Sequence, residues 1–200
     1  MGVGDLAHRY SDRPSAMQLL ESVKDSIGFD GEDVERLQKL KPELESHFPE
    51  IIDRLVEGLE VNGHAEPLLE TSQEDGRLRE AFQTWLEKTF SGEIDESYSE
   101  SQREIGELYH AWDIDPEHML GAMNVVRTEL VSSLLDRDLE LPFEDALVTL
   151  DRVLDLNMSL ILDAYWKSLV DEKNEVGSKL ASSMAHEIRN PLNAVELHLT

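Results

Sequence analysis

The sequence predicts an all-α fold. Apolar residues recur at intervals of three and four along most of the chain, which is the spacing that places them on one face of a helix. No segment shows the regular alternation of apolar and polar residues that is typical of a half-buried strand. Proline and glycine interrupt the helical pattern repeatedly, so we expect several helices joined by turns.

The N-terminal part of the chain predicts a loose segment followed by two helices. Residues 1–15 contain two glycines and a proline without apolar periodicity, and we expect a flexible N-terminus there. Ala16–Ile27 carries an apolar face and forms the first helix, which Gly28–Gly31 interrupts. Asp33 is then placed to cap the second helix, because its carboxylate can accept the unpaired N–H groups of a first turn.

Prolines and glycines mark the next boundaries. Pro42 and Pro49 are each expected to open a new helical segment, since proline is well tolerated in a first turn. The apolar stripe after Pro49 is strongly helical and ends near the Asn-Gly pair 62–63. The following helix is expected to start at the Thr-Ser pair 71–72 and to end at Gly92.

The C-terminal half predicts three helices, of which the last is unusually long. Ile94–Trp112 forms one of them, and the Asp-Pro pair 115–116 then caps and opens a helix that runs to Leu135. Pro142 opens a final helix without a break until Pro191, where we expect a bend. Unbroken, this helix would be about 75 Å long, more than a globular domain needs.

Composition excludes several classes of function. The net charge is −25, from 43 acidic and 18 basic residues, so nucleic acid and anionic membranes are not expected partners. Cysteine is absent, which excludes disulfides and thiolate metal sites. Residues 1–13 lack the apolar core of a signal peptide and no run of 18 apolar residues occurs, so we predict a cytoplasmic protein.

The segment Ser183–Asn193 carries the most specific motif of the chain. It reads Ser-Met-Ala-His-Glu-Ile-Arg-Asn-Pro-Leu-Asn and presents His186, whose neutral imidazole is a nucleophile near pH 7. Glu187 is adjacent and can orient the ring or accept its proton. Asn190 follows at i+4, so it shares a helix face with His186. For an isolated histidine, the simpler interpretation would be an exposed side chain on an amphipathic helix.

This string resembles the phosphoacceptor box of sensor histidine kinases. The resemblance implies that His186 accepts a phosphoryl group from ATP, that Glu187 is its acid–base partner, and that Asn190 positions a water for phosphatase activity. It also implies that residues 180–200 begin a four-helix dimerisation bundle, so we expect a homodimer. ATP-Mg would be bound by a domain that we expect after Thr200, so this chain alone should be inactive.

Residues 30–165 resemble the globin domain of globin-coupled sensors. The likeness rests on three stretches: Leu37-x-x-Leu40-x-Pro42 leading into His47-Phe48-Pro49-Glu50-Ile51-Ile52-Asp53-Arg54, Trp85-Leu86-x-x-x-Phe90-x-Gly92-x-x-Asp95-x-x-Tyr98 before Arg103-x-Ile105-Gly106, and Ile114-x-Pro116 with Leu120, Ala122 and Asn124. It implies a globin-like sensor domain over residues 16–169, a helical linker over 170–179, and the start of the phosphoacceptor domain over 180–200.

The resemblance also implies heme b as a candidate cofactor and a gas as a candidate ligand. In that family the pattern Ile-Gly-x-x-His supplies the ligand to heme iron, and here the matching position is Tyr109, followed by His110. The family also tends to have a Phe-Tyr pair in the heme pocket, and the matching residues of this chain are Leu55 and Val56. These two residues are therefore candidates for the pocket wall. Three interpretations stay open: a pocket without heme, a heme whose iron is bound by His110 or Tyr109, or another arrangement.

Together these features predict a cytoplasmic, dimeric sensor histidine kinase of a two-component phosphorelay. The globin-like domain would sense a signal, which is oxygen or another gas if heme binds, and would control autophosphorylation of His186. The phosphoryl group would then pass to the receiver domain of a response regulator. The alternative is a heme-free globin-like scaffold in a signalling assembly, and a nucleotide-binding domain after Thr200 would distinguish the kinase from the scaffold.

Overall fold

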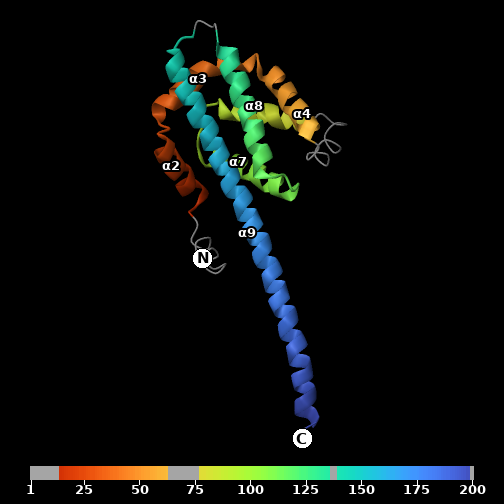
Figure 1. Ribbon diagram of the computed structural model, residues 1–200. Coiled ribbons are helices and arrows are strands. Elements are labelled where there is room, and N and C mark those ends of the chain that lie inside the picture. Colours follow the sequence, from red (N-terminus) through yellow and green to blue (C-terminus); the bar gives the residue numbers. More distant parts are fainter. Residues whose placement is uncertain (1–13, 63–76, 136–138, 199–200) are drawn as a thin grey trace.

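Helix α9 (Phe143–His198) is the axis of the structure, and the other helices pack around its first half (Figure 1). The computed structural model describes residues 14–62, 77–135 and 139–198, with the side chains of 59–62, 77 and 180–198 excepted. The described residues form seven helices and no strand, which confirms the predicted all-α class. The second half of α9 extends away from the other helices.

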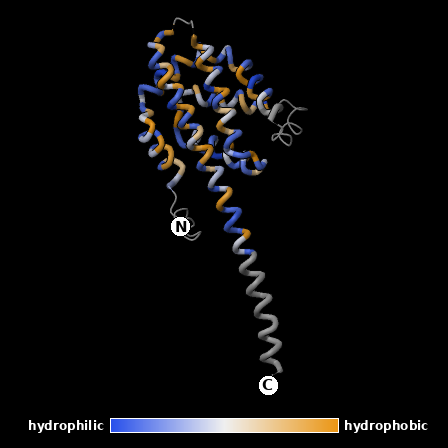
Figure 2. The backbone as a smooth tube through the Cα atoms, in the orientation of Figure 1, coloured by the Kyte–Doolittle hydropathy of each residue, from blue (hydrophilic) through white to orange (hydrophobic). Residues whose placement is uncertain are grey.

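Six helices precede α9 in the described chain. They are α2 (Ala16–Ile27), α3 (Gly31–Glu45), α4 (Phe48–Asn62), α6 (Arg77–Thr89), α7 (Glu96–Ala111) and α8 (Pro116–Leu134). Helices α2, α3, α7 and α8 all contact α9, whereas α4 packs against α6 and α8. Figure 2 shows apolar and polar residues alternating in short blocks along these helices, as expected when each helix buries one face.

The first two helix boundaries follow from capping residues. Helix α2 has the predicted bounds: the Ser15 hydroxyl accepts the N–H of Gln18 at 3.2 Å, and Gly28 ends the helix with a φ of 72°. The prediction that Asp33 caps α3 is wrong, because Asp30 occupies the N-cap position. Asp33 lies three residues later, where its carboxylate accepts the Asp30 N–H at 3.1 Å and is fully buried.

Pro42 does not open a new segment, which corrects a second prediction. It lies inside α3, where a proline removes one helix hydrogen bond. Leu40 and Leu44 on either side of it are fully buried, so tertiary packing holds the helix across the proline. Pro49 behaves as predicted, in the first turn of α4.

The later helices differ from the predicted bounds at their ends. The predicted start at residues 71–72 lies outside the described residues, and α6 ends at Thr89, before Gly92. Helix α7 is shorter than Ile94–Trp112 because the Asp95 side chain caps it by accepting the Tyr98 N–H at 3.0 Å. Asp115 precedes Pro116 at the start of α8 as predicted, but its side chain makes no capping hydrogen bond.

Two buried polar clusters join α9 to its neighbours. The Asp33 carboxylate accepts hydrogen bonds from the Thr149 hydroxyl at 2.6 Å and from the Arg152 guanidinium at 2.9 Å. The Tyr98 hydroxyl donates to the Asn157 side chain at 2.6 Å. Because each bond connects α9 to another helix, these clusters determine how α9 is seated as well as satisfying buried polar groups.

Helices α7 and α9 cross at Gly106 with almost no space between their backbones. A Cβ atom at this position would lie 2.2 Å from the Ile161 carbonyl oxygen and 2.8 Å from the Ala164 Cβ. A backbone carbonyl cannot move aside as a flexible side chain can, so only glycine permits this approach. Among the described residues, no helix is both long enough and apolar enough to cross a membrane.

We expect the substitution Gly106→Ala to destabilise the fold by about 1–3 kcal/mol, because it overpacks the α7–α9 crossing. Urea unfolding followed by circular dichroism measures this change. Gly121→Ala is the matched control, since nothing lies within 4 Å of a Cβ built at Gly121 on α8. The control should be neutral or stabilising, as helical glycines generally are when replaced by alanine. Equal free energies of unfolding for the two variants would contradict the close crossing.

Candidate ligand-binding site

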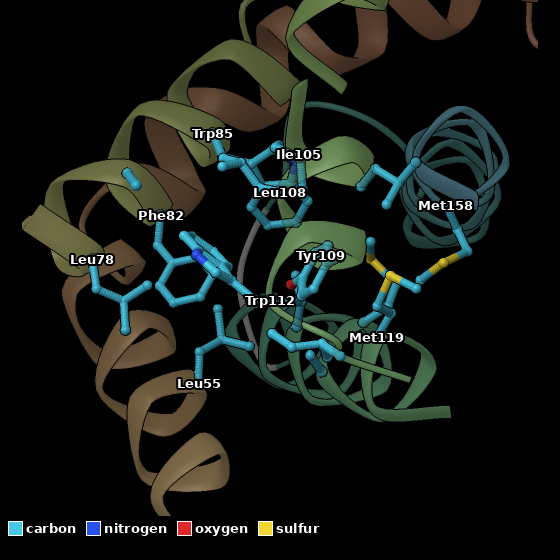
Figure 3. Close-up of a pocket in the computed structure, with 16 residues that line it drawn as sticks. Leu55, Leu78, Phe82, Trp85, Ile105, Leu108, Tyr109, Trp112, Met119 and Met158 are labelled. Carbon is cyan, nitrogen blue, oxygen red and sulfur yellow. The ribbon is translucent and has the colours of Figure 1, made fainter. Parts of the chain in front are cut away.

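An apolar cavity lies among helices α4, α6, α7, α8 and α9, with a volume of about 130 Å³. Every one of these five helices contributes side chains, and the turn between α7 and α8 contributes two more (Figure 3). The lining residues are Leu55, Leu78, Ala81, Phe82, Trp85, Ile105, Leu108, Tyr109, Trp112, Ile114, Met119, Ala122, Met123, Val126, Met158 and Ile161. No charged side chain is among them, so the cavity favours uncharged occupants.

The turn after α7 holds Tyr109 in the cavity wall. The Ile114 N–H donates to the Tyr109 carbonyl and the Asp113 N–H donates to the His110 carbonyl, both at 3.0 Å. These two bonds form a Schellman motif, and Asp113 takes the left-handed conformation with a φ of 55°. The motif brings Ile114 back toward Tyr109, and both residues line the cavity.

The Tyr109 hydroxyl is a neutral hydrogen-bonding group in this apolar surrounding. Burial raises the pKa of Tyr109 to about 12, so the phenol stays protonated at physiological pH. The Trp85 indole N–H, a second polar group of the lining, already donates to the Gln102 side chain at 3.1 Å. Within the described part of the chain the Tyr109 hydroxyl has no such partner, so it is available to an occupant of the cavity.

The structure separates Tyr109 from His110. The His110 ring lies 5.6 Å from the Tyr165 ring on α9, and its Nε2 atom is 3.4 Å from a Glu172 carboxylate oxygen. His110 does not line the cavity, because successive residues of a helix point about 100° apart. Of the other two candidates, Leu55 lines the cavity, whereas Val56 is buried in the core outside the lining.

The backbone of the predicted phosphoacceptor box lies in α9. His186, Glu187 and Asn190 are all within this helix, but their side chains lie outside the described part of the structure. Helix α9 also continues through Pro191 to His198, so the proline does not end it. The same helix lines the cavity with Met158 and Ile161, and the rise from residue 161 to 186 is about 37 Å.

Comparison with known proteins identifies the family of this chain and a solved structure with a similar fold. The Protoglobin family model matches residues 16–170. The chain belongs to the Protoglobin family. Its structure is similar to the globin domain of a Geobacter sulfurreducens globin-coupled sensor, with a TM-score of 0.67 and 23% sequence identity over 72% of this chain and 96% of that one. No curated protein sequence matches the chain.

Protoglobin-type domains typically bind heme, but the residues of this cavity do not fit it. A volume of about 130 Å³ is well below the roughly 300–1,000 Å³ of ordinary cofactor pockets. No histidine lines the cavity, so the lining offers no imidazole to heme iron. No basic side chain of the lining is available to meet the two carboxylates of a heme.

Sequence periodicity identified many of the lining side chains only as core residues. Phe82, Trp85 and Met123 lie on predicted helix stripes, and nothing in the stripe distinguishes a cavity wall from solid packing. The predicted stripes omit Met158, whereas helix spacing places Trp112 on one face with Ile105 and Tyr109. Small residues facing aromatic ones were the available signal: Ala81 and Ala122 leave room that larger side chains would fill.

We expect no Soret band in the absorption spectrum of this chain after expression with excess heme and purification, because the cavity is too small and offers no imidazole. Circular dichroism of the same sample should show a folded helical protein. A sharp Soret band that disappears in Tyr109→Phe and persists in the neighbouring control His110→Gln would contradict this expectation and would identify a tyrosine-ligated heme.

Proposed function

We propose that this protoglobin is the input region of a cytoplasmic sensor histidine kinase. Occupancy of the cavity changes how α7 and α8 pack on α9, and α9 transmits the change to His186. The observation that carries the proposal is the continuity of α9, which supplies Met158 and Ile161 to the cavity and reaches the phosphoacceptor box without interruption. A helix with two packing arrangements is a common element of signal transmission.

The sequence of the box supports the chemical roles. His186 would attack the γ-phosphorus of ATP through a ring nitrogen, and Glu187 would accept the proton on the other nitrogen. Asn190, one turn away, would hold the water that removes phosphate from the partner. ATP-Mg would be bound by a further domain of the full protein, and the receiver domain of a response regulator would take the phosphoryl group. We propose a homodimer, in which residues 180–200 contribute to a four-helix bundle.

The contacts of α9 divide it into a fixed part and a free part. Between Thr149 and Asn157 it is held by hydrogen bonds to Asp33 on α3 and Tyr98 on α7. Arg127 on α8 adds an ion pair to Asp155 at 2.6 Å. Residues 171–179 are exposed throughout, so no neighbour constrains them apart from the His110–Glu172 contact. A displacement of α9 near the cavity therefore passes along the helix toward His186, because apart from that contact no neighbouring helix of the described structure holds residues 171–179 in place.

A heme-free scaffold in a signalling assembly is the second candidate. The apolar cavity without a histidine favours it, because such a domain has no iron chemistry to offer. It does not account for the His-Glu-Ile-Arg-Asn-Pro string, which resembles the phosphoacceptor box of sensor histidine kinases.

Replacing His186 with glutamine in the full-length protein should abolish autophosphorylation, because no other imidazole occupies the box. Incorporation of acid-labile phosphate from labelled ATP measures the reaction. His198→Gln is the matched control, since it removes a second histidine from the same helix and should leave the labelling unchanged. Labelling that persists in His186→Gln would remove the kinase assignment and favour the scaffold.

Deletions in residues 171–178 test transmission through helix phase. Removing one or two residues rotates the following helix by about 100° or 200°, whereas removing four leaves it within roughly 40° of its original orientation. We expect the basal autophosphorylation rate to change strongly in the first two variants and weakly in the third. If every deletion left the rate and its regulation unchanged, α9 would not act as a rigid connector.

A further inference from the structure

The size of the cavity limits what can occupy it. Its volume of about 130 Å³ is close to that of an engineered apolar cavity of about 150 Å³ in another protein, which stays dry and binds benzene or xenon. An ordered water generally needs two to four polar partners, and the lining offers few hydrogen-bonding groups. The occupant is therefore an organic molecule of about one six-membered ring rather than a water cluster.

The chemistry of the lining selects an uncharged molecule with one polar group. An ion would lose its hydration without meeting an opposite charge, because no lining side chain is charged. The Tyr109 side chain is partly buried in the cavity wall, and burial raises the pKa of its hydroxyl, so this group stays neutral and can exchange a hydrogen bond with an occupant. A ligand with one hydrogen-bonding group can pair with this hydroxyl.

Methionine and aromatic side chains complete the surface. Met119, Met123 and Met158 have flexible, polarisable side chains that adapt to a ring and make favourable sulfur–aromatic contacts. Phe82 lies among the lining side chains with Tyr109 (Figure 3). These contacts favour a flat ring over a branched aliphatic molecule of equal volume.

The cavity has a route to solvent at the end of α7. Leu108 and Trp112 both line it, yet they are 46% and 38% exposed, so they form its rim. Trp112 lies at the C-cap of α7, immediately before the turn that holds Tyr109. A ligand can thus enter without unfolding the domain, and it meets α9 through Met158 and Ile161.

We propose that this cavity binds a small, uncharged, mainly apolar ring compound through a hydrogen bond to the Tyr109 hydroxyl. The compound is the input of the proposed sensor kinase, and in that respect the inference rests on the proposed function. Binding itself does not require phosphorylation, so it is testable in the 200-residue chain alone.

Phenol and toluene are the probes, because they have nearly the same shape and only phenol has a hydroxyl group. Selective ¹³C labelling of the methionine methyl groups reports binding by nuclear magnetic resonance. Saturable shifts are expected at Met119, Met123 and Met158, which line the cavity, and none at Met17, an exposed residue of α2. Absence of shifts at the three cavity methionines with either probe would overturn the proposal.

Two substitutions separate the hydrogen bond from simple burial. Tyr109→Phe should weaken phenol binding about threefold to tenfold, the effect of one hydrogen bond, and should leave toluene within about twofold. Equal effects on both probes would overturn the role given to the hydroxyl. Ala122→Leu should fill the cavity and weaken both probes, whereas the exposed control Ala111→Leu should weaken neither.

The outcomes also separate this inference from the proposed function. Methionine shifts in a protein whose full-length His186→Gln variant still incorporates phosphate would leave the ligand site standing and remove the kinase assignment. Loss of phosphate incorporation in that variant, together with no methionine shifts, would support the kinase assignment and remove the ligand site.

Discussion

The close crossing of α7 and α9 at Gly106 is the constraint on which the site depends. With no side chain between the backbones, α7 lies against the Ile161 carbonyl of α9. One turn later on α7, Tyr109 then faces the cavity while His110 faces Tyr165 on α9. Because Ile161 itself lines the cavity, the crossing also makes α9 part of the wall. A larger residue at the crossing would move both the wall and the phenol.

Buried hydrogen bonds determine how α9 sits in the domain. Asp33, a fully buried carboxylate, joins Thr149 and Arg152 at one end of the packed segment. Asn157 accepts from Tyr98 and donates to Thr89 at 3.3 Å further along. Such bonds are directional, so they specify rotation and register more strictly than apolar contacts alone. Met158 and Ile161 therefore lie next to a segment of α9 whose rotation and register are fixed by these bonds.

Tyr109 gives the cavity a phenol, and the lining contains no imidazole. The sequence resemblance to globin-coupled sensors aligns Tyr109 with their iron-binding histidine, and burial raises the pKa of its hydroxyl to about 12. That group can donate or accept one hydrogen bond and does not ionise at physiological pH. It lies in a lining of apolar and methionine side chains that contains no histidine.

The sequence by itself determined the all-α class, the bounds of α2, the first turn of α4 and the unbroken run of α9, because these depend on local spacing and on caps. Helix geometry alone also rotated His110 about 100° from Tyr109, to the edge of the apolar face. Tertiary structure decided the rest. It kept Pro42 inside α3 by burying Leu40 and Leu44, and it turned Asp33 from a predicted cap into a buried partner of Thr149. It also brought five helices around one cavity, since a periodic pattern specifies which face of a helix is apolar, whereas the identity of the facing helix depends on long-range packing.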